Sequence, residues 1–180
     1  MNLHYYIEKA KKFCDENKLS TRFFILIDYS IPSGKDRFFV VDFIKEAIIF
    51  KTLTTHGSAR GYNNGYEKCF VERGMGNIIS PVYFSNKYDS FCSSLGKILI
   101  NEKYSGFYGR AYRLDSLEEI NSNIRKRCVV LHEWDVIPDC EVFPEEIIES
   151  HGCPAISSTA FSFIEKIIDD NPGMMIWVVE

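Results

Sequence analysis

Two periods of apolar residues run through the chain, and they predict where its helices and strands lie. Over residues 3–17 the apolar side chains recur every three to four positions, which predicts an amphipathic helix. A second amphipathic helix is expected at Ser157–Asp169, with an apolar face formed by Phe161, Ile164, Ile167 and Ile168. An Asn-Pro-Gly sequence at 171–173 follows and ends this helix.

The remaining apolar segments are short and rich in aromatic and β-branched residues, which is typical of β-strands. The first three are separated by a Pro-Ser-Gly turn at 32–34 and a hairpin at 44–46, as at the start of an antiparallel β domain. The expected strands are Arg22–Tyr29, Arg37–Phe43, Ala47–Thr54, Ile79–Phe84, Leu95–Ile100, Gly109–Leu114, Arg127–Trp134 and Met174–Val179.

Loops and one short helix complete the expected elements. A long loop is expected over residues 57–76 and another over 135–149, the second with one helical turn at 144–146. Ser116 and Glu119 have the spacing of a capping box, which predicts that a short helix begins there.

These elements indicate a mainly β protein with a minor helical part. We expect one domain, because 180 residues can bury one sizeable core and no linker, repeat or low-complexity segment divides them. The domain is expected at residues 21–180, with a helix at 1–20 packed on it. Its sheet is expected to be a bent mixed sheet or a sandwich that carries a cleft, with a helix after Cys153.

Composition and charge exclude several classes of function. The net charge of -4 gives no basic footprint for nucleic acid, and no apolar run is long enough for an integral membrane segment. Residues 1–18 are charged and amphipathic, so they do not resemble a signal peptide. The six cysteines match neither a zinc finger nor a Cys-x-x-Cys redox motif, and Cys92 and Cys128 are expected in the core because their surroundings are apolar.

The segment Ser-His-Gly-Cys-Pro-Ala at 150–155 has the residue types of a nucleophile site. Cys153 lies just before a segment that can begin a helix, and a helix N-terminus or a nearby cation favours the reactive thiolate. Gly152 leaves room for a substrate to approach the backbone, and the amides around Cys153 can point at a developing oxyanion. Pro154 suits a first helical position.

A cysteine nucleophile needs a base, and His132 is the best-placed candidate. It ends the apolar run at 129–132, which predicts a buried strand that delivers an imidazole to its end. Ser150 can brace the nucleophile's turn by hydrogen bonding to the backbone. For His151 and His56 both a substrate-contacting or supporting role and a purely structural role remain open.

The spacing of these residues resembles the L,D-transpeptidase catalytic domain (YkuD-like) family. Seventeen residues, 133–149, separate His132 from Ser150, as in a family signature of a histidine, a gap and then Ser/Thr-His-Gly-Cys. Further blocks resemble the bacterial murein L,D-transpeptidase branch, which has a Gly-Cys-Pro-Ala motif. They span roughly residues 22–179 and comprise Thr54–Ser58, Phe84–Asn86, Ser93–Gly96, Tyr104–Gly106 and Gly152–Ala155.

The resemblance implies cysteine-dependent acyl transfer on peptidoglycan stem peptides. The residue matching Cys153 attacks the diaminopimelate–D-Ala bond of a tetrapeptide, and an acceptor amine resolves the thioester to a 3-3 cross-link. With water as acceptor, the same enzyme is an L,D-carboxypeptidase. The implied roles are base for His132, base-orienting carbonyl for Glu133, and oxyanion hole for the amides of Gly152 and Cys153. No metal or organic cofactor is implied.

Three departures from the commonest family pattern concern the substrate. Glu133 stands where glycine is frequent. Pro154 and Ala155 stand where an aliphatic residue and arginine are common, which removes a possible carboxylate-binding cation beside the nucleophile. An insert at residues 62–77 is a candidate cover for the cleft. The candidate substrate-binding or supporting residues are His151, Ser150, His56, Arg60, Asn86, Tyr104 and Arg110.

The resemblance also implies a carbapenem-sensitive enzyme of the bacterial cell envelope. A monomer is expected. A periplasmic or otherwise extracytoplasmic location is expected on the assumption that a leader is missing from this chain, and a cytoplasmic location stays open. Two alternative functions stay open as well. One is a zinc-dependent hydrolase, and the other is an inactive cell-wall binding domain that keeps the pocket; the zinc ligands would come from His56, His132, His151 and Cys153.

Overall fold

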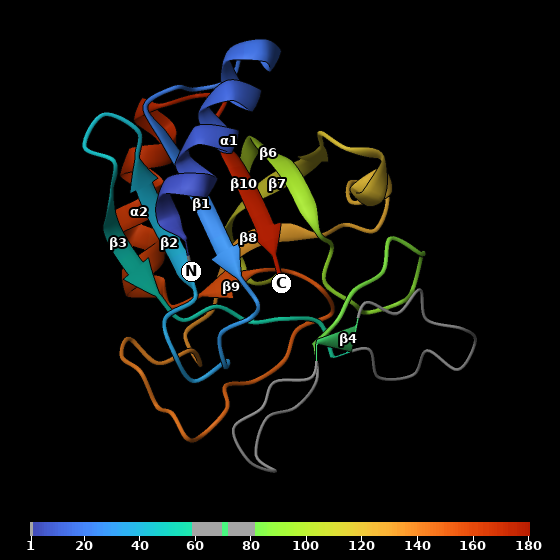
Figure 1. Cartoon of the computed structure of the whole chain (residues 1–180). Coiled ribbons are helices and arrows are strands. Elements are labelled where there is room, and N and C mark those ends of the chain that lie inside the picture. Colours follow the sequence, from blue (N-terminus) through green and yellow to red (C-terminus); the bar gives the residue numbers. More distant parts are fainter. Residues whose placement is uncertain (1, 59–69, 72–81) are drawn as a thin grey trace.

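A computed structural model of the chain describes residues 2–58 and 82–180, together with the backbone of residues 70–71 (Figure 1). Its elements in chain order are α1 (Leu3–Asn17), β1 (Phe23–Asp28), β2 (Phe38–Asp42), β3 (Ala47–Thr52), β4 (Phe70–Val71), β5 (Val82–Tyr83), β6 (Gly96–Gly106), β7 (Gly109–Ser116), the 3₁₀ turn η1 (Glu119–Asn121), β8 (Val130–Glu133), β9 (Ala155–Ile156), α2 (Ser158–Asp170) and β10 (Met175–Val179).

Eight of the described strands form one mixed sheet in the order β3-β2-β1-β10-β6-β7-β8-β9, and β4 pairs with β5 apart from it. The β1–β10 and β8–β9 pairs are parallel, and the other neighbours in the large sheet are antiparallel. The expected mainly β class with a mixed sheet is confirmed, as is a helix after Cys153.

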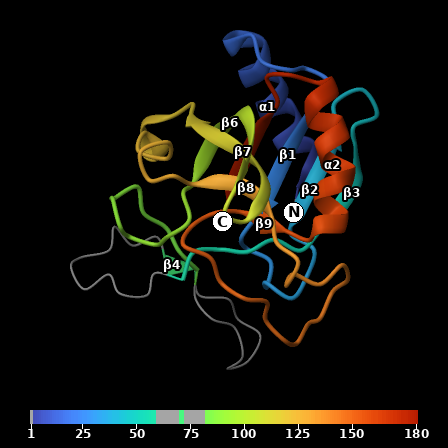
Figure 2. The ribbon, with the colours of Figure 1, turned by 180° about the vertical axis from the view of Figure 1, so that it is seen from behind.

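Helices cover both faces of the large sheet, α1 on one face and α2 on the other (Figures 1 and 2). Strand β1 shows why, since successive side chains of a strand point to opposite faces. Ile25 and Ile27 belong to the core against α2, whereas Phe24 and Leu26 belong to the core against α1. All four side chains are fully buried, so β1 is a continuous apolar run, as a strand between two layers must be.

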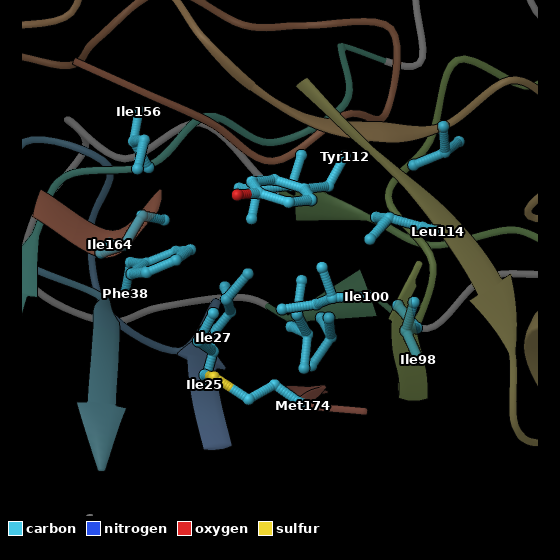
Figure 3. Close-up of a cluster of buried hydrophobic side chains, with 14 of the residues drawn as sticks. Ile25, Ile27, Phe38, Ile98, Ile100, Tyr112, Leu114, Ile156, Ile164 and Met174 are labelled. Carbon is cyan, nitrogen blue, oxygen red and sulfur yellow. The ribbon is translucent and has the colours of Figure 1, made fainter. Parts of the chain in front are cut away.

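The larger core lies between α2 and the sheet, and it fixes the position of β8. Leu131 of β8 is fully buried in this core, so the next side chain, that of His132, points to the other face of the strand. Burying a leucine side chain contributes about 1.5–3 kcal/mol, which any slip in the register of β8 would forfeit. Figure 3 shows this core, with labelled side chains from Ile25, Ile27, Phe38, Ile98, Ile100, Tyr112, Leu114, Ile156, Ile164 and Met174.

At one end of the sheet, β8 and β9 bring the candidate base and nucleophile to neighbouring strands. His132 pairs in parallel with Ala155, and the His132 N–H donates to the Pro154 carbonyl at 3.4 Å. Cys153 therefore directly precedes the part of the chain that runs beside His132. Helix α2 begins after β9, where the Ser157 hydroxyl caps it by accepting the Ala160 N–H at 3.1 Å.

The predicted capping box at 116–119 is wrong. Ser116 ends β7, and its hydroxyl donates to the Glu118 carbonyl at 2.7 Å instead of capping a helix. The Glu118 carboxylate accepts the backbone N–H of Lys97 at 2.6 Å and its ammonium at 2.8 Å. These contacts with β6 outcompete the local helix signal, and only the short turn η1 follows.

Three further local predictions need correction. The strand expected at 95–100 continues as β6 to Gly106, because its polar second half pairs with β7. Residues 144–146 form a turn without helical structure. Cys128 is exposed in the turn before β8, where its φ is 56°, whereas Cys92 is fully buried as expected.

Some expectations fall wholly or partly outside the described residues. These are Arg60, the insert at 62–77, most of the loop at 57–76, and residues 79–81 of the strand expected at 79–84, whose residues 82–83 form β5. None of the helices that the structure describes is long and apolar enough to cross a membrane.

Candidate active site

A cavity of about 220 Å³ lies beside β8 and the segment that leads into β9. It is lined by the predicted nucleophile and base together with polar, aromatic and charged neighbours. The described lining residues are Tyr108, Arg127, Cys128, His132, Trp134, Glu149, Ser150, His151 and Cys153. The fold thus brings Cys153 and His132, which are twenty-one positions apart in the sequence, to one small cavity.

The Cys153 thiol is half-buried, and its sulfur accepts the backbone N–H of Val130 at 3.4 Å. Burial raises the pKa of this thiol, against the opposite effects of the Val130 N–H and the Arg127 guanidinium. The expected help from a helix N-terminus is absent, because β9 intervenes and α2 begins only at Ser158. Pro154 is accordingly not a first helical residue, and the thiol needs a base to become a thiolate.

The turn before Cys153 is held by a set of hydrogen bonds to backbone carbonyls. The Ser150 hydroxyl lies 2.7 Å from the Cys153 carbonyl and 3.2 Å from the His56 carbonyl, and it accepts the Gly152 N–H at 3.1 Å. The Thr55 hydroxyl donates to the Cys153 carbonyl at 2.8 Å. Ser150 therefore braces the turn as expected, and segment 55–57 supports it from the other side.

Gly152 is required by the packing of its turn, and the room that it was expected to leave for a substrate stays a prediction. Its φ is 107°, and a β-carbon there would lie 2.4 Å from the Cys92 carbonyl oxygen. Its N–H is engaged by Ser150. The N–H of Cys153, by contrast, has no acceptor among the described residues, so it is the more available of the two candidate oxyanion donors.

The imidazole of His132 is held in its neutral form. Its Nδ1 lies 2.9 Å from the Glu133 carbonyl oxygen. A carbonyl only accepts, so Nδ1 carries the proton and Nε2 is left with its lone pair. Burial lowers the pKa of the imidazole, although Glu133 acts in the opposite direction. The two shifts together describe a neutral imidazole beside a neutral thiol, which suits proton transfer during attack rather than a preformed ion pair.

The side chain of Glu133 fixes the strand end that presents this carbonyl. Its carboxylate accepts the backbone N–H of Arg110 at 2.8 Å and pairs with the Arg110 guanidinium at 2.6 Å. A β-carbon at Gly109 would lie 2.6 Å from the Glu133 carboxylate, so the glycine makes room for it. The glutamate that departs from the family pattern thus ties β8 to β7.

Comparison with known proteins bears on this geometry. A family model described as the L,D-transpeptidase catalytic domain matches residues 1–177. The chain belongs to this family. The resemblance seen in the sequence is confirmed, and the match includes α1.

Two solved L,D-transpeptidase structures are similar to this family member. One is from Xylanimonas cellulosilytica, with a TM-score of 0.48, and the other is L,D-transpeptidase 1 of Mycobacterium tuberculosis, with a TM-score of 0.44. Each is 11% identical in sequence, and each comparison covers 88% of this chain but only 61% of the solved chain. A search of curated proteins finds no match.

Two of the predicted supporting residues of this L,D-transpeptidase domain, Ser150 and His151, line the cavity. His151 is exposed, and its ring lies 4.5 Å from that of Phe91 between centroids. His56 is buried away from the lining, and its Nδ1 accepts a hydrogen bond from Arg37 Nη2 at 2.8 Å. Burial, with Arg37 adding to it, lowers the pKa of His56 to about 3.

Asn86, Tyr104 and Arg110 do not line the cavity. The Asn86 side chain bonds to the segment at 122–123, at 2.9 and 3.0 Å. The Tyr104 ring lies 4.5 Å from the Arg113 guanidinium. Arg110 reaches the site only through Glu133, which it anchors. A substrate-binding role for these three stays a prediction.

The zinc alternative has no ligand cluster in the part of the chain that the structure describes. There, no three His, Cys, Asp or Glu side chains are grouped as a metal ion requires. His56, one of the four residues proposed for that reading, has its Nδ1 bonded to a guanidinium, and this positive neighbour disfavours a metal cation.

The aromatic rings beside His132 were not predicted from the sequence. Strands β6 and β7 are joined by only two residues, Phe107 and Tyr108. The Tyr108 ring centroid lies 4.9 Å from that of His132 and 5.8 Å from that of Trp134, so aromatic rings shield the imidazole from water. Two aromatic residues between glycines at a hairpin tip were the signal, because Asn and Gly usually occupy such turns.

Arg127 was missed as well, and it corrects the expected loss of a cation beside the nucleophile. It lines the cavity, and its charge acts on the Cys153 thiol. An arginine three residues before a strand carries no signal of this kind in the sequence. Only the fold shows that Arg127 lies next to the turn at Gly152.

Proposed function

We propose that the protein is a cysteine-dependent acyltransferase acting on peptidoglycan stem peptides. One observation carries this proposal: Cys153 and His132 line the same cavity, and the hydrogen bond from His132 Nδ1 to the Glu133 carbonyl leaves Nε2 as a proton acceptor. Membership of the L,D-transpeptidase family supplies the substrate class. Such a substrate would place the enzyme in the cell envelope.

In the proposed reaction, His132 Nε2 takes the thiol proton as the sulfur attacks the carbonyl between diaminopimelate and D-Ala. The Cys153 N–H stabilises the oxyanion, and Gly152 joins it if its N–H leaves the Ser150 hydroxyl. The C–N bond then breaks, the imidazolium returns its proton to the leaving D-Ala amine, and a thioester remains. An acceptor amine loses a proton to His132 and displaces the sulfur, which leaves as a thiolate and takes this proton back from the imidazolium. The product is a 3-3 cross-link, while water in place of the amine gives the tripeptide.

Intact-mass spectrometry tests this chemistry directly. After incubation with a stem tetrapeptide, the wild-type protein should gain the mass of the peptide minus D-Ala, and Cys153→Ala should gain nothing. A carbapenem should add one drug mass to the same cysteine, because opening of its β-lactam forms a stable acyl-enzyme. Cys128→Ser is the matched control, since Cys128 lines the same cavity, and it should still be acylated.

The role of His132 is tested by the rate of the same step. His132→Gln should slow acylation about 10²–10⁴-fold, which is the usual contribution of a positioned base. An adduct that persists in Cys153→Ala and is lost in Cys128→Ser would show that the nucleophile is misassigned. Peptide binding without any adduct in the wild-type protein would instead indicate a binding domain that keeps the pocket.

A further inference from the structure

The half-buried guanidinium of Arg127 donates hydrogen bonds to three neutral oxygen atoms. Nη1 donates to the Ser85 carbonyl at 2.6 Å and to the Ser94 hydroxyl at 2.8 Å. Nη2 donates to the Cys92 carbonyl at 2.5 Å. These acceptors are neutral, so they orient the guanidinium without compensating its charge.

No carboxylate lies within ion-pair distance of Arg127 among the described residues, whereas three other arginines each have one. An N–O distance of 2.8 Å or less joins a carboxylate to each of Arg22, Arg110 and Arg125. A guanidinium carries five N–H donors. Three of them are used by Arg127, so two have no acceptor in the described chain. Burial lowers the pKa of Arg127, yet arginine stays charged at any physiological pH.

The position of this uncompensated charge is next to the nucleophile. Arg127 Nη2 would lie 3.3 Å from a β-carbon at Gly152, the residue before Cys153. Among the described residues that line the cavity, Arg127 is the only lysine or arginine. A half-buried cation facing a cavity and held by neutral groups is a ready site for an anion, because the partner charge is missing and the geometry is already fixed.

We propose that Arg127 binds the C-terminal carboxylate of the D-amino acid that leaves during acylation; this rests on the function proposed above. Consecutive α-carbons are about 3.8 Å apart, so the carboxylate of the leaving residue lies within one residue length of the carbonyl that Cys153 attacks. The same small cavity must therefore contain both groups. A guanidinium pairs with a carboxylate through two parallel N–H···O bonds. Arg127 then selects donors whose cleaved residue is the last of the stem.

The test compares a stem tetrapeptide ending in a free carboxylate with the same peptide ending in a carboxamide. Binding is measured by calorimetry on Cys153→Ala protein, so that no reaction occurs and thiol ionisation plays no part. Two further proteins combine Cys153→Ala with a second substitution, Arg127→Met in one and Arg127→Lys in the other. Arg113→Met is the matched control, because Arg113 is exposed on β7 and packs on Tyr104 outside the cavity.

In the two proteins that keep Arg127, Cys153→Ala alone and the Arg113→Met control, we expect amidation of the peptide to weaken binding about tenfold or more. This is the range of a charge-assisted pair. In Arg127→Met the two peptides should bind within twofold of each other, and Arg127→Lys should lie between. Equal effects of amidation in the Arg127 and Arg127→Met proteins would overturn the proposal, because a purely structural arginine would weaken both peptides alike.

Two outcomes keep this proposal separate from the proposed function. If Arg127→Met does not fold, as judged by its near-ultraviolet circular dichroism, the Arg127→Lys comparison decides, and an undiminished effect of amidation there refutes the bidentate pairing. If the wild-type protein forms an acyl-enzyme from both peptides at equal rates, the proposed function stands and the carboxylate site is wrong. If amidation matters for binding but no thioester forms, the carboxylate site stands and the acyltransferase is wrong.

Discussion

The buried His56, which lies behind the turn that precedes Cys153, should make the protein sensitive to mild acid. His56 is 3% exposed, its pKa is lowered to about 3, and its Nε2 has no hydrogen-bond partner among the described residues. Glu149 Oε1 lies 3.8 Å from Nε2 and would favour the imidazolium, but burial and Arg37 act more strongly the other way. The folded protein therefore holds His56 neutral at every pH above about 4.

The magnitude follows from proton linkage. The unfolded chain binds a proton at His56 with a pKa of about 6.5, so the unfolded state is favoured as the pH falls below that value. The stability that His56 contributes is complete above pH 6.5 and is lost as the pH falls towards 3. Between pH 7.5 and 5.0 the loss from this residue is about 2 kcal/mol. Any folded-state pKa of His56 below about 4 gives the same loss of stability between pH 7.5 and 5.0.

Urea unfolding followed by tryptophan fluorescence measures the effect. His56→Gln keeps an acceptor for Arg37 but cannot be protonated, so its stability should fall less between pH 7.5 and 5.0, by about 2 kcal/mol relative to wild type. Contributions from His132 and from the carboxylates cancel in this difference. His4→Gln is the control, because the His4 side chain is 69% exposed on α1, and it should keep the wild-type dependence. Identical pH dependence in His56→Gln and wild type would refute the reasoning.

Three other outcomes follow from the described contacts. Gly152→Ala should lower the free energy of unfolding by about 2 kcal/mol or more, since its φ is positive and a backbone oxygen lies 2.4 Å from the new β-carbon; Gly106→Ala, whose nearest neighbour is a side chain, should cost less. Ser157→Ala should cost about 1 kcal/mol in urea unfolding through loss of the α2 cap, with exposed Thr159→Ala as the neutral comparison. Alkylation of Cys153 by iodoacetamide, mapped by mass spectrometry, should keep accelerating from pH 7 to 9 because burial raises the thiol pKa, and a plateau below pH 8 would contradict this.

The parts of the fold that could be predicted are those in which the local pattern and the tertiary environment agree. Strand β1 is buried on both faces and reads as an unbroken apolar run, and α2 has one apolar face and a serine cap. The motif around Cys153 and the strand bearing His132 are also local, and their spacing led to the family.

The parts that could not be predicted depend on contacts between distant segments. The polar half of β6 is a strand only because β7 pairs with it. The Glu118 carboxylate binds the backbone N–H of Lys97, so the helix that the local sequence predicts does not form. Arg127 is placed at the cavity by carbonyls about forty positions earlier in the sequence, which no local pattern encodes. The motif around Cys153 is therefore visible in the sequence, whereas the side chains that surround it in the cavity are not.

The central place of β10 in the sheet has a consequence for how the chain is made. It is the last of the described strands in sequence, yet it lies between β1 and β6 and pairs with both. While a ribosome synthesises the chain, the β3-β2-β1 group and the β6-β7-β8-β9 group emerge first, each with an unpaired inner edge. Such edges pair readily with other chains. The nascent protein is therefore most prone to aggregation in the interval before β10 emerges, and a chaperone that covers the open edges of β1 and β6 would protect it then.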